Sequence, residues 1–173
     1  ARYEQYALIS FPGTFAAKMA RAGVHVKCAN RGFFSATVEN CLSVRKAIAG
    51  FAPEIVHFNG VAGLPALLAA KTLAVPVIQH VRVFGLAGYE DQLDWAERVV
   101  AVSEFVAGHL RRRNVQPDKI KVVWDGVDAA EFAPRACDRE QSRHNLRIPP
   151  GTSLVTVVAR HSRSKRQDLA VRA

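Results

Sequence analysis

The sequence is poor in cysteine and lacks the spacing that marks disulfide frameworks and cysteine-based metal sites. Its 173 residues include three cysteines, Cys28, Cys41 and Cys137, and no two of them form a CxxC pair. An odd number of separated cysteines argues against both kinds of site. We therefore expect buried, reduced thiols in a cytoplasmic protein.

Long hydrophobic runs, low-complexity tracts and internal repeats are also missing, and no secretory signal is visible at the start. The nearest approach to a membrane span is GVAGLPALLAAKTLAVPVI, which contains Pro65, Lys71 and Pro76. A single membrane-crossing helix tolerates these residues poorly, so the run predicts a helix followed by a strand. No GxGxxG motif follows an apolar run, which argues against a dinucleotide-binding enzyme.

Acidic residues are scarce relative to basic ones. The chain has 15 Asp and Glu against 24 Lys and Arg, a formal net charge of +9. This excess favours an anionic partner such as a phosphate group, although a basic domain without such a partner is an equal alternative. The charges form no stripe interleaved with aromatic residues, so we expect no nucleic-acid partner.

Short runs rich in Val and Ile alternate with stretches of helical spacing. Runs of this kind are typical of buried strands, and their alternation with helices predicts right-handed crossovers. The predicted fold class is α/β, a Rossmann-like and mostly parallel sheet with helices on both faces. The predicted strands are residues 24–28, 54–58, 75–81, 98–102, 120–124 and 154–159.

A polar, charged stretch interrupts this pattern at PRACDREQSRHNLRIPPGTS, and Pro149-Pro150-Gly151 breaks it near its end. Such composition connects compact units more often than it fills a core. We predict one domain over residues 1–150 and the start of a second over residues 151–173.

Two segments on either side of this boundary resemble the glycosyltransferases of family 4, which have the GT-B fold. They are AERVVAVSEFVAGHLRRRNVQPDKIKVVWDGVDAAEF and LVTVVARHSRSKRQDLAVRA. Upstream, PEIVHFNG resembles the family strand that ends in His-x-His. The matching residues are His57, Val102-Ser103, Pro117, Lys119-Ile120, Gly126-Val127-Asp128, Phe132, Arg160 and Lys165.

The resemblance implies two Rossmann-like domains that face a cleft, one for the acceptor and one for the nucleotide sugar. Residues 1–150 would be the acceptor-side domain, with its first strand ahead of Ala1. Residues 151–173 would be the first strand, loop and helix start of the donor domain, so the chain is expected to be a fragment that is inactive alone. Asp125 stands where the family usually has Asn, and Ala159 and Arg166 stand where it usually has Gly.

Arg160 and Lys165 are the expected donor phosphate-binding residues. Sugar transfer expels a diphosphate, and fixed cations stabilise the charge that grows on it. By resemblance these two cations replace a metal ion, so we expect neither a metal nor another cofactor. The alternative is a solvated basic loop.

On the acceptor side, His80 and Arg82 compete for the position where the family often has a catalytic His. His80 can exchange a proton near neutral pH, whereas Arg82 fits the family register better and would bind an anionic group. The alternative for His80 is a half-buried strand residue. The other predicted cleft residues are His57, Asn59, Ser103 and Glu104, of which Ser103 is first a helix cap.

The predicted function is transfer of a sugar from a nucleotide-diphosphate donor to a saccharide or lipid-linked acceptor. By resemblance it is retaining and metal-independent, and belongs to bacterial cell-envelope glycan synthesis, such as that of lipopolysaccharide. The basic run Arg111–Arg113 would allow peripheral contact with an anionic membrane at its inner face. The alternative is a basic Rossmann-type domain that binds nucleic acid or a dinucleotide.

Overall fold

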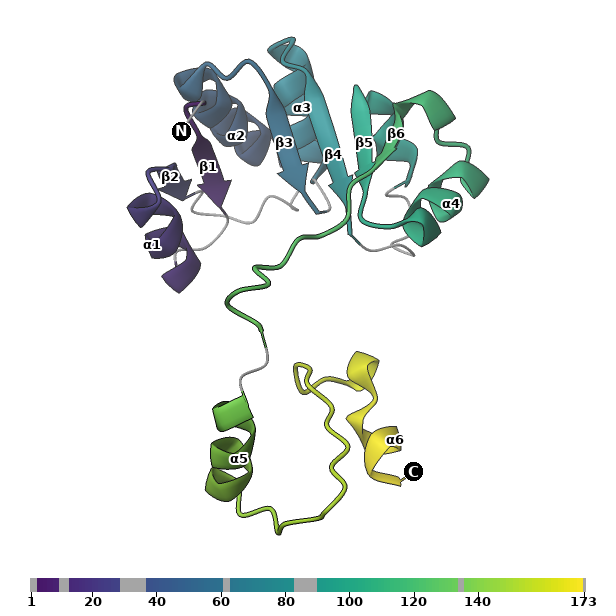
Figure 1. Ribbon diagram of the computed structural model, residues 1–173. Helices are drawn as coiled ribbons and strands as arrows, with labels where there is room; N and C mark the ends of the chain where they lie inside the picture. The colour runs from purple at the N-terminus through teal and green to yellow at the C-terminus, as the bar shows by residue number, and fades with distance from the viewer. Residues whose placement is uncertain are drawn as a thin grey trace. The chain divides into compact units, whose positions relative to one another are not determined.

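The computed structural model describes residues 3–9, 13–28, 37–60, 63–82, 90–133 and 136–172. These residues form two compact units, Ala1–Asp125 and Gly126–Ala173. The division falls earlier in the sequence than the domain boundary that we predict near residue 150. Strands occur only in the first unit among the described residues (Figure 1).

The strands of the first unit are all parallel to their neighbours. A two-stranded sheet pairs β1 (Tyr6–Ile9) with β2 (His25–Cys28). A four-stranded sheet has the order β3-β4-β5-β6. Its members are β3 (Val56–Asn59), β4 (Val77–Val81), β5 (Arg98–Ala101) and β6 (Ile120–Val122). In Figure 1 the β1-β2 pair lies on the β3 side of the four-stranded sheet, and no strand pairing joins the two sheets among the described residues.

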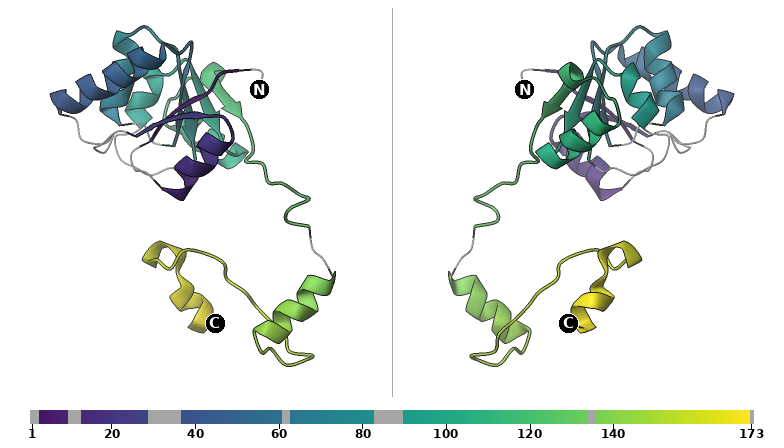
Figure 2. Two further views of the ribbon diagram at one scale, coloured as in Figure 1. Left: turned by 90° about the vertical axis from the view of Figure 1, so that its left-hand side faces the viewer. Right: turned by 90° about the vertical axis from the view of Figure 1, so that its right-hand side faces the viewer.

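Helices alternate with these strands, which confirms the predicted α/β class. They are α1 (Thr14–Arg21), α2 (Val38–Phe51), α3 (Leu64–Thr72) and α4 (Glu104–Arg112), with 3-10 turns η1 (Glu90–Trp95) and η2 (Pro117–Lys119). Helices α2 and α3 pack side by side, as Figures 1 and 2 show. Within the described ranges, no helix is both long and apolar enough to cross a membrane. The apolar run 60–78 contains α3 and the start of β4, as predicted.

The two faces of the four-stranded sheet differ in burial. Val77, Val81, Val99 and Ala101 are buried with the inner residues of α3 and α4 in one hydrophobic core. The alternate positions of the same strands are more accessible, because successive side chains of a strand point to opposite faces. The more accessible face carries the histidines of β3 and β4.

Strand β1 corrects one expectation. We predicted that the strand before the first helix lies ahead of Ala1, but it lies at Tyr6–Ile9 and pairs in parallel with β2. The sequence YALI has a single β-branched residue, so its composition does not distinguish it from a loop. The thiols of Cys28 and Cys41 are free but only partly buried, whereas the side chain of Cys137 lies outside the described residues.

The second unit contains α5 (Ala136–Asn145), η3 (Arg163–Lys165) and α6 (Gln167–Arg172). The strand predicted over residues 154–159 is wrong, because this segment has no regular structure. Val155 and Val158 are 93% and 92% exposed. A strand needs a neighbour that pairs with its backbone groups, and the described part of this unit contains no other strand.

Candidate functional site

The candidate site lies where β3, β4, β5 and β6 end. Asn59 is paired with His80, and Val81 is paired with Ala101, which in turn is paired with Val122. The carboxyl ends of the four strands therefore meet at one edge, which is where open α/β sheets bind ligands. Most of the polar residues predicted for the acceptor side follow or end these strands.

Arg82 connects the ends of three strands. Its Nη1 donates a hydrogen bond to Oδ1 of Asn59 over 2.9 Å. Its Nη2 lies 2.6 Å from Oδ1 of Asp125, and the two side chains are 40% and 52% exposed. Asn59 ends β3, Arg82 follows β4 and Asp125 follows β6. One guanidinium group therefore joins the ends of these three strands.

Asp125 is the residue that sequence reasoning missed. The sequence marks it as a departure from the family pattern, and it is not among the predicted site residues. The available signal was its place directly after the predicted strand 120–124, at the same edge as Asn59 and Arg82.

His57 and His80 form a second pair on the accessible face. Their rings stack with centroids 5.6 Å apart and planes inclined by 21°. Asn59 and His80 are register partners, so His57, two residues before Asn59, lies diagonally across from His80. The Nε2 atom of His80 is buried and has no hydrogen-bond partner among the described residues.

Both imidazoles are held in the neutral form. Partial burial lowers the pKa of His57, and the neighbouring His80 lowers it further. Burial lowers the pKa of His80 as well; Arg82 acts in the same direction, and Asp125 partly offsets it. A neutral imidazole accepts a proton or a hydrogen bond at neutral pH, as a general base requires.

Gln79 fixes the end of β3 from the buried face. Its Nε2 donates a hydrogen bond to the carbonyl oxygen of Gly60. The backbone N–H of Gly60 donates to the carbonyl of His80 over 3.0 Å, and Gly60 has a φ of 108° that favours glycine. The chain therefore leaves β3 along a defined path next to Asn59.

Ser103 and Glu104 start α4 directly after β5. The Ser103 Oγ accepts a hydrogen bond from the Val106 N–H over 3.2 Å, which confirms its predicted role as a helix cap. The Glu104 Oε2 lies 3.8 Å from Arg111 Nη1 on the same helix. The structure therefore engages both side chains within α4, and their role in an acceptor cleft stays a prediction.

A cavity of about 520 Å³ lies beside this edge, between β1, α1, α2 and β3. Most of its lining is apolar, and His57 and Asn59 belong both to this lining and to the polar site. Apolar cavities with a few polar groups at one end are typical of small-molecule sites. The lining includes Phe15, Met19, Phe51, Ile55, His57 and Asn59.

In the second unit, Arg160 and Lys165 are both exposed. The carbonyl of Arg160 accepts a hydrogen bond from Gln167 Nε2 over 2.7 Å, and the Lys165 N–H donates to Ser162 O over 3.0 Å. A cavity of about 510 Å³ is lined by other residues of this loop, namely His161, Ser162, Arg163, Arg166, Gln167 and Asp168. The predicted phosphate-binding role of Arg160 and Lys165 stays a prediction.

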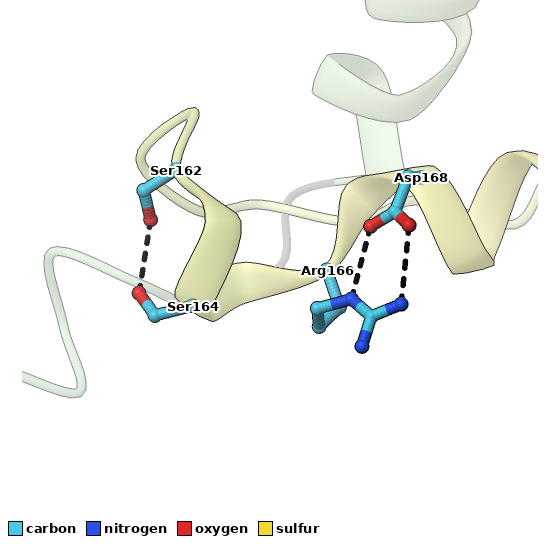
Figure 3. Close-up of polar contacts among 4 residues, drawn as sticks. All are labelled: Ser162, Ser164, Arg166 and Asp168. Carbon is cyan, nitrogen blue, oxygen red and sulfur yellow. Dashed lines mark hydrogen bonds and ion pairs between the residues drawn. The ribbon is translucent and has the colours of Figure 1, made fainter.

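Figure 3 shows the polar contacts of this loop. The hydroxyls of Ser162 and Ser164 lie 3.1 Å apart, and Arg166 pairs with Asp168 through Nε–Oδ1 and Nη2–Oδ2 contacts of 3.1 and 3.2 Å. Arg166 has a φ of 48°, in the left-handed region. Glycine adopts this conformation without steric cost, which explains why glycine suits this position in the family pattern.

No cluster of three or more His, Cys, Asp or Glu side chains suited to a metal ion occurs within the described ranges. The Asp128 Oδ1 accepts hydrogen bonds from the N–H groups of Ala130 and Glu131 over 2.9 and 3.2 Å, so this side chain stabilises the turn that follows it.

Comparison with known proteins gives a consistent result for sequence and fold. The chain is 35% identical over 91 residues to a D-inositol 3-phosphate glycosyltransferase of Salinispora arenicola, a match that covers 50% of the chain and 20% of that protein. The corresponding Salinispora tropica protein is 34% identical over 91 residues, covering 50% of the chain and 19% of that protein.

Among solved structures, a glycosyltransferase from Rickettsia africae has a TM-score of 0.67 at 21% identity and covers 84% of the chain. HepE of Anabaena, in complex with UDP and glucose, has a TM-score of 0.65 at 16% identity and covers 82% of the chain. The matched region is 42% of each of these two structures, so the chain spans less than half of their length.

The family comparison covers most of the first unit. The sequence model of Glycosyltransferase Family 4 matches residues 8–131, a segment that includes the whole polar edge from His57 to Asp125. The matched solved structures share the α/β fold with its parallel sheet. The chain belongs to Glycosyltransferase Family 4.

Proposed function

We propose that the chain forms the acceptor-side half of an enzyme that transfers a sugar from a nucleotide-diphosphate donor to a saccharide or lipid-linked acceptor. The observation that carries this proposal is the family match over residues 8–131, which contains the joined strand ends around Arg82. The relatives support the donor class, since HepE was solved with UDP and glucose. Family membership favours this function over a nucleic-acid or dinucleotide-binding domain.

His80 and Arg82 have different chemical capacities in this proposal. The neutral His80 ring has the capacity to accept a proton near neutral pH, as a general base requires. Arg82 cannot act as a base and instead presents fixed N–H donors to oxygen atoms. The two side chains therefore complement each other at one edge, and which of them fills the catalytic position of the family is a matter for mutagenesis.

The acceptor would lie along the edge with its polar end at His57 and Asn59. The adjoining cavity of about 520 Å³ has room for an apolar portion of such a molecule, as a lipid-linked acceptor has. The basic end of α4, Arg111–Arg113, would assist contact with an anionic membrane at its inner, cytoplasmic face, since each such charge adds about 1 kcal/mol near the surface. These features suit a role in cell-envelope glycan synthesis.

The donor diphosphate would be stabilised by Arg160 and Lys165. Arg160 offers a planar fork of donors and Lys165 a mobile point charge, and both suit phosphate oxygens. Such cations stabilise the leaving group without a metal ion, so the proposed transfer is metal-independent. By the family resemblance it retains the configuration of the sugar.

The test is made in the full-length protein that contains this chain, by measuring release of the nucleoside diphosphate. Arg160→Ala and Lys165→Ala should each lower kcat by about 10²–10³, the usual cost of losing one transition-state donor. Arg163→Ala is the matched control, since it removes a neighbouring exposed cation of the same loop, and should change turnover by less than about fivefold. Equal turnover of all three variants and the unmodified enzyme would refute the donor-site proposal.

A further inference from the structure

Arg82 is paired with a carboxylate, that of Asp125, at the proposed acceptor edge. The Asp125 Oδ1 lies 2.6 Å from Arg82 Nη2, and the amide oxygen of Asn59 holds Nη1 at 2.9 Å. A guanidinium group has several N–H donors, so within the described part of the chain these two contacts leave other donors of Arg82 available to a ligand. The side chain is fixed from both sides, and it remains 40% exposed.

Asp125 also balances the charge of Arg82. Asn59 is neutral, and the two imidazoles nearby are held neutral, so Arg82 and Asp125 together contribute no net charge to the site. Asparagine, the usual residue of the family at this position, would accept the same hydrogen bond and leave the guanidinium uncompensated. The Asp125 carboxylate therefore both positions the Arg82 side chain and neutralises its charge.

We propose that Asp125 is a positioning and specificity-determining residue: it fixes Arg82 across the strand ends and cancels its charge, so that the free N–H donors bind uncharged oxygen-rich groups, such as sugar hydroxyls, in preference to phosphate or carboxylate. The site at the carboxyl edge then takes the neutral hydroxyl-bearing part of an acceptor. The assignment to an acceptor rests on the proposed function, whereas the preference for uncharged groups rests on the contacts and the opposite charges of Arg82 and Asp125.

Coulomb's law gives the size of the preference. A phosphate dianion bound to the free donors of Arg82 would lie at roughly 6 Å from the Asp125 carboxylate. In a water-like dielectric, which suits side chains 40% and 52% exposed, the repulsion at that distance weakens binding by about tenfold. Removing the carboxylate charge should therefore strengthen phosphate binding by about tenfold.

The test uses inorganic phosphate as the probe and the 173-residue chain itself, at about pH 8 and low salt. The NMR signal of the Arg82 Nε–H group reports binding at this residue. In the unmodified chain we expect weak binding, and in Asp125→Asn a dissociation constant about tenfold lower. Asp125→Glu, which keeps the charge, should bind phosphate as weakly as the unmodified chain.

Asp118→Asn is the matched control, because it changes the net charge equally but lies in η2, ahead of β6. Its phosphate affinity at Arg82 should equal that of the unmodified chain. The proposal is overturned if Asp125→Asn binds no more tightly, or if Asp118→Asn tightens binding equally, since net charge would then explain the effect. If Asp125→Asn disturbs the backbone spectrum of the unit, Asp125→Ser is measured against the same criteria.

The two proposals can fail separately. The phosphate titration needs no sugar transfer and tests only the charge preference at Arg82. If the Arg160 and Lys165 variants keep full turnover, the donor-site proposal is refuted, but the phosphate titration at Arg82 is unaffected.

Discussion

Acidification should destabilise the first unit through His57 and His80. Burial lowers the pKa of both imidazoles in the folded chain, whereas the unfolded chain titrates near the ordinary value of about 6.5. The unfolded state therefore binds more protons as the pH falls through that value. The contribution of each histidine to stability is fully present above about pH 6.5 and is lost below it, down to the lowered pKa of the folded state.

The structure limits the size of this effect. One proton taken up on unfolding corresponds to a slope of at most about 1.4 kcal/mol per pH unit, so the loss from each histidine is at most about 1.4 kcal/mol for every pH unit by which its pKa is lowered. His80 should contribute to the loss of stability at low pH, because protonation places a donor on its buried Nε2. No described residue accepts a hydrogen bond from this atom. The stacking of the two rings at 5.6 Å opposes charging both at once.

The assay is urea unfolding at pH values from about 5 to 8, followed by tryptophan fluorescence. Both tryptophans, Trp95 and Trp124, belong to the first unit, so the signal reports that unit. The variants His57→Gln and His80→Gln should each flatten the dependence of the unfolding free energy on pH. The control His161→Gln, in the second unit, should leave the curve unchanged.

The opposite result would refute the reasoning. If the chain becomes more stable as the pH falls from about 7 to 5, and the two Gln variants abolish that gain, the imidazoles are stabilised in their charged form. A carboxylate that pairs with them in solution would then dominate over burial. An unchanged slope in both variants would equally contradict the assignment of the effect to this pair.

Two further changes should alter stability in predictable directions, both measured by urea unfolding at about pH 7.5. Ser103→Ala removes the side-chain acceptor for the Val106 N–H and should cost about 1 kcal/mol, with Ser103→Asp near neutral; an equal loss in both variants would exclude the cap as the cause. Ala52 and Ala74 are exposed residues in the left-handed region, with φ of 45° and 54°, where a side chain is strained, so Ala52→Gly and Ala74→Gly should each stabilise the unit by about 0.5–1 kcal/mol. The control Ala49→Gly, inside α2, should destabilise the unit by about as much. Destabilisation by all three variants would contradict backbone strain at Ala52 and Ala74.

The strands that the sequence predicts correctly are those whose composition and neighbours agree. Residues of β4 and β5 are rich in Val and Ile and lie inside a sheet, so local propensity and tertiary pairing favour the same state. Residues 154–159 have equally strong β propensity but no described partner strand, and remain irregular. Strand β1 is the reverse case, in which a weak sequence becomes a strand because β2 pairs with it. β propensity alone does not predict which of these segments forms a strand, because a strand also needs a second strand that pairs with its backbone.

The candidate site shows the same limit in chemical terms. The sequence indicates that polar residues follow neighbouring strands, and it therefore brings His57, Asn59, His80 and Arg82 to one edge. It does not show which of them touch, because contacts across the sheet depend on register and on side-chain reach.

Arg82 follows β4 and its partner Asp125 follows β6, and the sheet order β3-β4-β5-β6 brings these two strand ends to the same edge. The different surroundings of His80 and Arg82 likewise become visible only in the structure, and which of the two fills the catalytic position stays a prediction. His80 is a strand residue stacked on His57, whereas Arg82 lies just beyond the strand and is bound by Asn59 and Asp125, so the two side chains occupy separate places at the same edge.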